Sequence, residues 1–421
     1  MSPATTRESR VTWSTAVGVV VGGAAYCAIL LDFARSLTRN AVQLGYASNF
    51  FDFQARALMD GHLWVQPGSL GIEGFIRDGH TYMYFPPFPA LLRIPVMLVT
   101  HDFDGRLTVV SMALAWLLFA VMTVKLFWLV RRCLAGSRAV SRFEAVLAAA
   151  FLSMALGGTV VTFDASLPWV YHEVYLWAVA LVVGGLYWLV RVALDPTPRS
   201  IAWLGALTLG AMLTRVTGGW ALSLCVLVLA GWLATGRPHR EARSMWRWVL
   251  AAGLVPLAVG VAYNYVKFQH PYLFPLEDQV WTQLNAHRRE ALRINGGTIT
   301  GPQFFATSLA NYFQPAGIRF VGYFPWITLP AEPAAAYGGA FIDQSYRTGS
   351  VTAFMPLALV LTMVSLPVLF RPRVDLAHRA LRLALVAGVL VTGGVMAYGY
   401  LAYRYTSEFV PAILLGGSIG L

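Results

Sequence analysis

Three charged residues near the start of the chain have a spacing that suits acid–base chemistry. Asp52, Arg56 and Asp60 follow one another at intervals of four residues, so on a helix they would share one face. Asp52 could then take the proton of an incoming hydroxyl group, with Arg56 orienting the carboxylate. The same spacing also fits an exposed ladder of ion pairs, each worth a few tenths of a kcal/mol. Both interpretations stay open.

A second group of ionisable residues lies where one apolar segment ends and the next begins. Asp164, His172 and Glu173 together could hold a metal ion or a metal–phosphate complex. A His-Glu pair without a second histidine at helical spacing is a weak metal signal, and a lone interfacial histidine more often makes hydrogen bonds. The identity of any metal is therefore unknown, and a divalent ion stays open as a cofactor.

Two arginines lie within or beside apolar sequence. Arg215 interrupts the long apolar stretch Ile201–Leu233, and Arg404 lies between Tyr403 and Tyr405. Each could simply extend its charge to the lipid headgroups. Guanidinium groups also bind phosphate through paired hydrogen bonds, so Arg215 and Arg404 could instead converge on one phosphate. For Arg404 we favour the phosphate interpretation.

The elements that must position these residues are membrane helices. The 421 residues are 57% hydrophobic and only 12% charged, with a mean hydropathy of +0.60, which predicts a polytopic membrane protein. The net charge of +11 does not indicate a nucleic-acid partner, because most arginines lie in short connections between apolar segments. The three cysteines offer neither a disulfide framework nor a metal motif.

We predict an all-α fold, a transmembrane helical bundle of about 10 spans that forms a single domain over residues 1–421. Ile201–Leu233 is expected to form a tight pair of helices turning near Arg215, and Pro87–Val99 a half-helix opened by prolines. Phe409–Leu421 stops short of a full span, which suggests a chain truncated within a span. The clear spans are Trp13–Leu31, Leu107–Val130, Ala145–Phe163, Trp169–Val190, Trp248–Val266, Val351–Phe370 and Leu383–Tyr400.

Basic residues in the short connections predict the topology of the chain. By the positive-inside rule they place the N-terminus in the cytoplasm. Two long outer loops, residues 35–106 and 267–350, then lie outside and carry short juxtamembrane helices. The predicted location is the plasma or inner membrane, with an extracytoplasmic active site.

Several short motifs together resemble the GT-C superfamily of integral-membrane glycosyltransferases. They are the acidic Asp52 behind the first span with an Ala-containing helix ending at Gly61, and the Tyr84-Phe85-Pro86-Pro87 element. Tyr263-Asn264, and Arg404-Tyr405 ahead of Pro411, complete the set. The Arg- and Ala-rich composition is similar to that of actinobacterial envelope enzymes.

The resemblance implies inverting transfer of a sugar from a polyprenyl-phosphate donor to a hydroxyl group of a glycan, lipid or protein acceptor at the outer face. Asp52 would be the general base. Contacts to the donor phosphate or substrate would come from Arg404, Tyr405, Arg215, His172, Glu173, Arg56 and Tyr84. The alternative is a transporter or flippase for a lipid-linked or small substrate, against which we find no inverted hydropathy repeat. A scaffold without chemistry would leave Asp52, Arg215 and Arg404 unexplained.

Overall fold

The chain folds into a bundle of helices in a computed structural model, which describes residues 3–33, 47–236, 244–323, 326–371 and 375–421. Seven helical segments in this part of the chain are long and apolar enough to cross a membrane. They are Ser9–Leu30, Thr108–Ala135, Arg142–Ala165, Val170–Leu194, Val216–Ala234, Trp246–Phe268 and Leu376–Met396. The elements that form them are α1 (Pro3–Leu30), α5 (Thr108–Ala135), α6 (Arg142–Gly157) with α7 (Val160–Ala165), α8 (Val170–Leu194), α10 (Val216–Ala234), α11 (Trp246–Phe268), and α17 (Leu376–Val391) with α18 (Gly393–Met396).

The predicted count of about ten spans is not confirmed, because three further helices of the bundle are shorter than the roughly 20 residues that a membrane span needs. These are α9 (Pro198–Met212), α16 (Pro356–Leu369) and α19 (Val410–Gly420). The predicted span Val351–Phe370 is broken into α15 (Val351–Phe354) and α16 by a non-helical residue, Met355. Met355 precedes Pro356, and the proline ring disfavours helical dihedrals in the residue before it. The pair predicted in Ile201–Leu233 is present as α9 and α10, which turn at Leu213–Arg215.

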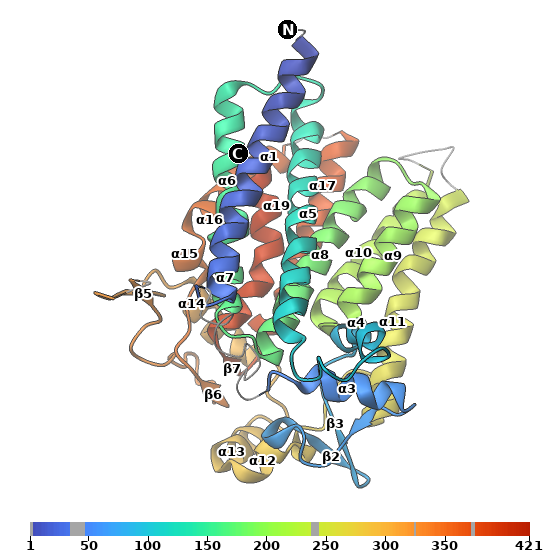
Figure 1. The fold of residues 1–421 in the computed structure, drawn as a ribbon, viewed down its shortest axis with the longest axis vertical. Helices are drawn as coiled ribbons and strands as arrows, with labels where there is room; N and C mark the ends of the chain where they lie inside the picture. The colour runs from blue at the N-terminus through green and yellow to red at the C-terminus, as the bar shows by residue number, and fades with distance from the viewer. Residues whose placement is uncertain (1–2, 34–46, 237–243, 324–325, 372–374) are drawn as a thin grey trace.

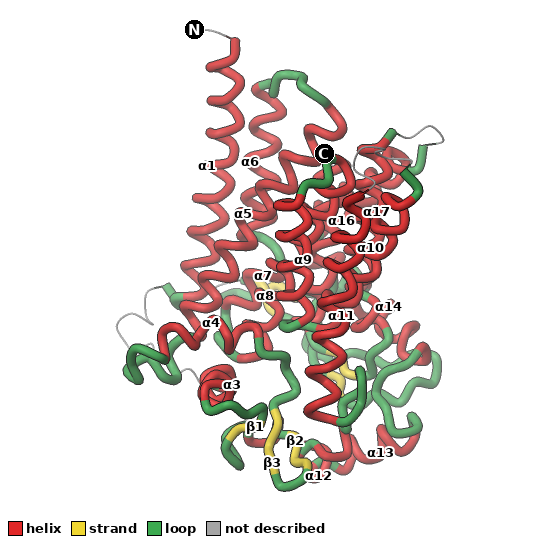
Figure 2. Tube along the Cα trace, turned by 90° about the vertical axis from the view of Figure 1, so that its right-hand side faces the viewer, coloured by secondary structure: helices red, strands yellow, loops and turns green. Residues whose placement is uncertain are grey.

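Successive helices of the bundle run in opposite directions, with α7 continuing α6 and α18 continuing α17, and the two ends of the bundle differ in character. The N-terminus and the basic α5–α6 connection lie at one end, at the top of Figure 1. The irregular segments gather at the other end, which we call the loop end. Figure 2 shows α3 (Phe50–Met59), the β1–β3 sheet, α12 (Val280–Leu284) and α13 (Ala286–Ile294) together below the long helices.

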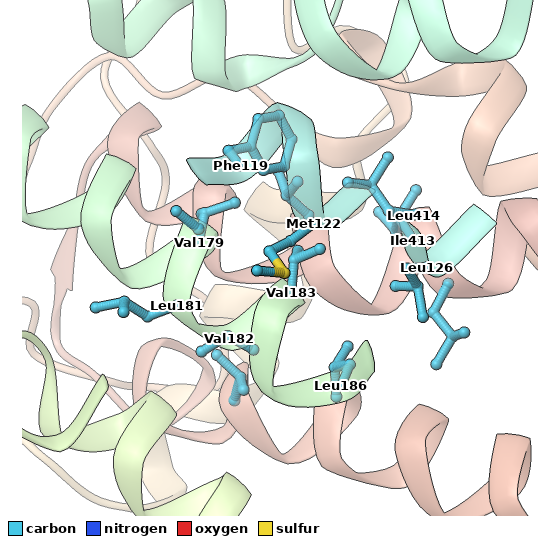
Figure 3. Packing of buried hydrophobic residues seen from close by; sticks show 14 of the residues in the cluster. Phe119, Met122, Leu126, Val179, Leu181, Val182, Val183, Leu186, Ile413 and Leu414 are labelled. Carbon is cyan, nitrogen blue, oxygen red and sulfur yellow. The ribbon is translucent and has the colours of Figure 1, made fainter. Parts of the chain in front are cut away.

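Helix α8 is the centre of the bundle. Of its most apolar stretch, 83% is buried inside the protein, compared with 28% for α1 and 22% for α11, so α8 is enclosed by protein while α1 and α11 lie at the periphery. Figure 3 shows side chains of α8, among them Val179, Val183 and Leu186, packed with Phe119 and Met122 of α5. The polar residues at the first turn of α8 are therefore held by a closely packed helix.

Helix α1 packs against α6 through glycines. A Cβ atom added at Gly18 would lie 2.5 Å from the Cβ atom of Leu152, and one added at Gly22 would lie 2.5 Å from that of Leu156. On the opposite helix, a Cβ atom at Gly157 would lie 2.8 Å from the Cα atom of Gly22. Such distances are shorter than van der Waals contact, so only glycine allows the two backbones to approach this closely.

The first segment of the loop end contains more strand than the all-α prediction allowed. After α3 come β1 (Trp64–Val65), η1 (Gly71–Glu73), β2 (Phe75–Arg77) and β3 (His80–Tyr82), and then α4 (Phe88–Met97). The three strands form an antiparallel sheet in the order β1-β3-β2. They are two or three residues long, too short for an alternating pattern to be visible in the sequence.

The second segment runs from α11 to α15 and joins the first. It contains η3 (Leu276–Asp278), α12, α13, η4 (Pro302–Phe304), α14 (Phe305–Phe313), β4 (Arg319–Phe320), β5 (Ile327–Thr328) and β6 (Gln344–Ser345). The Val280 amide donates to the Gly74 carbonyl over 3.0 Å, and Phe75 forms a β-bridge with Gln279. Strand β6 pairs in parallel with β7 (Tyr400–Leu401), which precedes η5 (Tyr403–Phe409). The loop end is thus one connected assembly.

Thiol labelling in intact cells tests the topology. His62→Cys and Ala335→Cys, both at the loop end, are expected to react with a membrane-impermeant reagent added outside. Arg138→Cys and Arg240→Cys should not react until the membrane is opened, because short basic connections remain in the cytoplasm. Arg240 lies outside the described residues. Reaction at position 240 in sealed cells would contradict the predicted topology.

Candidate functional site

Asp52 belongs to a buried cluster of three charged side chains. The Arg93 guanidinium on α4 donates to both carboxylate oxygens of Glu173, over 2.7 and 2.9 Å. The Arg93 Nε atom lies 3.3 Å from the Asp52 Oδ1 atom. Asp52, Arg93 and Glu173 are 3%, 2% and 0% exposed. One guanidinium therefore serves two carboxylates that come from α3 and α8.

The two carboxylates of this cluster are held unequally. Arg93 forms its paired hydrogen bonds with Glu173, whereas neither oxygen of Asp52 has a hydrogen-bond partner among the described residues. Burial raises the pKa of Asp52 to about 7, against the opposing effect of Arg93 and with a further increase from Glu173. A carboxyl group that titrates near neutral pH can accept a proton and release it again, as a general base must.

The raised pKa of Asp52 predicts how stability depends on pH. Its pKa is about 7 in the folded protein and 3.8 without burial, so the folded state binds the extra proton between these values. The contribution of this proton to the free energy of unfolding is therefore fully present below about pH 4. It falls as the pH rises through 7, by up to about 4 kcal/mol in all. Asp52→Asn removes this loss. The variant should unfold at a higher temperature than the wild-type protein at pH 8, and the advantage should shrink at pH 5.

Arg404 lies half-buried among aromatic rings at the loop end. Its guanidinium carbon is 4.8 Å from the ring centroid of Tyr171, 5.2 Å from that of Tyr405 and 5.8 Å from that of Tyr400. In the described part of the chain, no carboxylate lies within 4.0 Å of it. Phe85 contacts Tyr171 with centroids 6.0 Å apart, so the predicted Tyr84–Pro87 element borders the same group of rings.

Arg215 is occupied by an ion pair. Its Nε atom donates to Glu408, which Thr217 also contacts over 3.3 Å. The guanidinium lies 4.5 Å from the ring centroid of Tyr175 and 5.8 Å from that of Tyr405. The cavity beside the pair measures about 10 Å³, enough for one water molecule but not for a phosphate. Arg215 and Arg404 thus border the same ring of Tyr405, and of the two only Arg404 is without a carboxylate among the described residues.

Asp164, His172 and Glu173, considered above as a possible metal site, have separate partners in the structure. The Nε2 atom of His172 lies 2.5 Å from the Tyr403 hydroxyl, and Asp164 accepts a hydrogen bond of 2.5 Å from Ser407. Glu173 turns instead to Arg93. Among the described residues, no three His, Cys, Asp or Glu side chains are placed to hold a metal ion.

Two predictions about the face of α3 are wrong. Arg56 neither orients Asp52 nor forms a ladder with Asp60, because it pairs with Asp104, over 2.7 Å between Nη2 and Oδ1. Asp104 lies in the turn before α5, which tertiary folding brings to α3. Asp52 itself is enclosed by protein, since its side chain is only 4% exposed.

Arg93 is the residue that sequence reasoning missed. It is the one charged side chain in the predicted half-helix Pro87–Val99, and a charge within apolar sequence is a candidate functional group. No protein-family model matches the chain, and no curated protein matches its sequence. Function is therefore inferred from these side chains, together with the resemblance noted in the sequence.

Proposed function

We propose that the protein is a glycosyltransferase that uses a polyprenyl-phosphate sugar, with Arg404 binding the donor phosphate. The proposal rests on which arginines at the loop end, buried or half-buried, form an ion pair with a carboxylate. Arg93, Arg215 and Arg288 each pair with a carboxylate, whereas Arg404 has none within 4.0 Å in the described part of the chain. A guanidinium that is partly removed from water is costly without a counter-ion, so a bound phosphate would stabilise it.

Asp52 would be the base that activates the acceptor hydroxyl. The hydroxyl proton passes to Asp52 while the oxygen attacks the anomeric carbon of the sugar. The bond from that carbon to the phosphate oxygen breaks, the electron pair leaves with the phosphate, and the sugar carbon inverts. Arg404 would stabilise the negative charge that develops on the departing phosphate.

The two centres are connected by aromatic side chains in contact. Phe51, the neighbour of Asp52, lies 6.3 Å between ring centroids from Phe85, which lies 6.0 Å from Tyr171 beside Arg404. Because Asp52 is buried, an acceptor hydroxyl would reach it only after Phe85 or α3 moves.

The site is proposed to face the outside of the plasma or inner membrane, with the N-terminus in the cytoplasm. The acceptor would be a hydroxyl group of a glycan, lipid or protein. The direct test is transfer of labelled sugar from a polyprenyl-phosphate donor by the purified protein in lipid nanodiscs. Movement of intact lipid-linked sugar across the bilayer of proteoliposomes without transfer would favour a flippase instead.

Arg404→Lys is expected to weaken the binding of polyprenyl phosphate about tenfold, although the charge is retained. Lysine cannot form the paired hydrogen bonds of a guanidinium, and its ammonium group would lose the stacking on Tyr171 and Tyr405. Binding is measured on protein shown to be folded by its thermal unfolding midpoint. Arg289→Lys, at an exposed position whose hydrogen bonds go to carbonyl groups, is the matched control. Unchanged affinity in Arg404→Lys would mean that Arg404 only extends its charge toward the headgroups.

A further inference from the structure

Four polar side chains at the loop end form a row of hydrogen bonds that no part of the proposed reaction uses. Arg288 donates to Asp343 over 2.6 Å and to Gln279 over 3.0 Å. Gln279 in turn donates to Glu73 over 3.3 Å. Glu73, the last residue of η1, ends the row and keeps part of its surface exposed. The row fixes a carboxyl group of the first loop segment to the second segment.

Tyr171 places this carboxyl group beside the proposed phosphate site. Phe75, two residues after Glu73, packs on Tyr84 with ring centroids 5.8 Å apart, Tyr84 on Phe85 (4.0 Å) and Phe85 on Tyr171 (6.0 Å), and the Tyr171 centroid lies 4.8 Å from the guanidinium carbon of Arg404. Burial raises the pKa of Glu73, and Tyr171, Arg404 and Arg288 act in the opposite direction. Glu73 and Arg404 do not form an ion pair within 4.0 Å, and Tyr171 interacts with both. The carboxyl group is thus close to Arg404 but not used as its counter-ion.

This arrangement suits a sugar attached to a phosphate. A carboxylate can accept hydrogen bonds from two neighbouring hydroxyl groups, and the faces of tyrosine rings pack against the C–H groups of a sugar. Tyr84 lies in the same group, since its ring centroid is 5.8 Å from that of Phe75, two residues after Glu73. The sugar follows the phosphate by one bond, so a phosphate on Arg404 would bring the sugar next to Glu73.

We infer that Glu73 recognises the donor sugar, accepting hydrogen bonds from hydroxyl groups of a neutral monosaccharide whose phosphate is held by Arg404. The inference rests on the proposed function. A neutral sugar is favoured over a uronic acid because a second carboxylate beside Glu73 would add repulsion between like charges. Gln279 and Arg288 act through Glu73, as positioning residues that fix its orientation.

The test compares lipids that differ only in the sugar. Undecaprenyl phosphate and undecaprenyl-phosphate glucose and mannose are titrated into the protein in nanodiscs. The wild-type protein is expected to bind at least one sugar-bearing lipid more tightly than undecaprenyl phosphate. In Glu73→Gln that preference should fall about tenfold, the value of one hydrogen bond to a charged group, while the affinity for undecaprenyl phosphate stays the same. Glu277→Gln, the same change at an exposed position in η3, should leave both affinities unchanged.

The other possible outcomes contradict either the inference about Glu73 alone or the proposed phosphate site as well. If Glu73→Gln keeps the full preference, or if the wild-type protein binds the two kinds of lipid equally, the inference about Glu73 is wrong while Arg404 can still bind phosphate. If undecaprenyl phosphate itself does not bind to the wild-type protein, the phosphate site of the proposed function is wrong, and the sugar subsite with it. Thermal unfolding midpoints of all variants confirm that they are folded.

Discussion

Asp52→Asn should lower the rate of sugar transfer about 100-fold or more, the usual contribution of a general base. Asparagine has nearly the same shape as aspartate and can still contact Arg93, so the variant should fold and bind donor. It cannot accept the proton of the acceptor hydroxyl. The measurement is turnover by the purified variant with a polyprenyl-phosphate sugar, with donor affinity determined in parallel.

Asp60→Asn is the matched control for this prediction. Asp60 lies two helical turns from Asp52, about 12 Å along the axis, and therefore cannot approach the same hydroxyl. Its replacement should leave turnover nearly unchanged. If Asp52→Asn retains normal turnover while Asp60→Asn or Glu173→Gln abolishes it, the base has been assigned to the wrong carboxylate.

Arg93→Met should destabilise the protein by about 3–5 kcal/mol, the largest loss of stability that we expect from a single ion pair in this chain. Removing the guanidinium leaves Glu173 buried without a counter-ion, and both of its paired hydrogen bonds are lost. Thermal unfolding in detergent measures the loss. Arg56→Met removes a similar pair that is partly exposed to solvent, and it should cost less than about 1 kcal/mol.

A double variant separates the loss of pairing from the loss of packing. Arg93→Met combined with Glu173→Gln no longer buries an unpaired carboxylate at position 173, so it should recover much of the stability lost in Arg93→Met alone. If the double variant is as unstable as the single one, Arg93 contributes through packing against Phe51 or through its contact with Asp52, and not through its pair with Glu173.

Helices could be predicted from the sequence where apolar length alone decides them. The turn near Arg215 followed from length too, since one apolar stretch was too long for a single span. The break at Met355 did not, because a proline in an apolar stretch is compatible both with a kinked span and with two helices. The strands β1–β3 were beyond prediction, as each is stabilised by pairing with the others and by Phe75 packing on Phe268.

The candidate site was predictable in its residue types but not in its pairings. Asp52 and Glu173 were both selected from the sequence, yet they are 121 residues apart and nothing local indicates that Arg93 joins them. Arg56 shows the converse error. Its helical spacing to Asp52 and Asp60 suggested local pairs. The contact with Asp104, 48 residues away, prevails because both Nε and Nη2 of Arg56 donate to the carboxylate.

The glycine contact between α1 and α6 has a consequence for the order of events during synthesis. The glycine face of α1 is complementary to a helix that begins 112 residues after α1 ends, counted from Leu30 to Arg142. At about 5–20 residues per second, a ribosome needs roughly 6 to 22 seconds to reach α6. For that time α6 cannot cover Gly18 and Gly22. Assembly of the bundle is complete at this interface only when the later helix arrives and closes against the first.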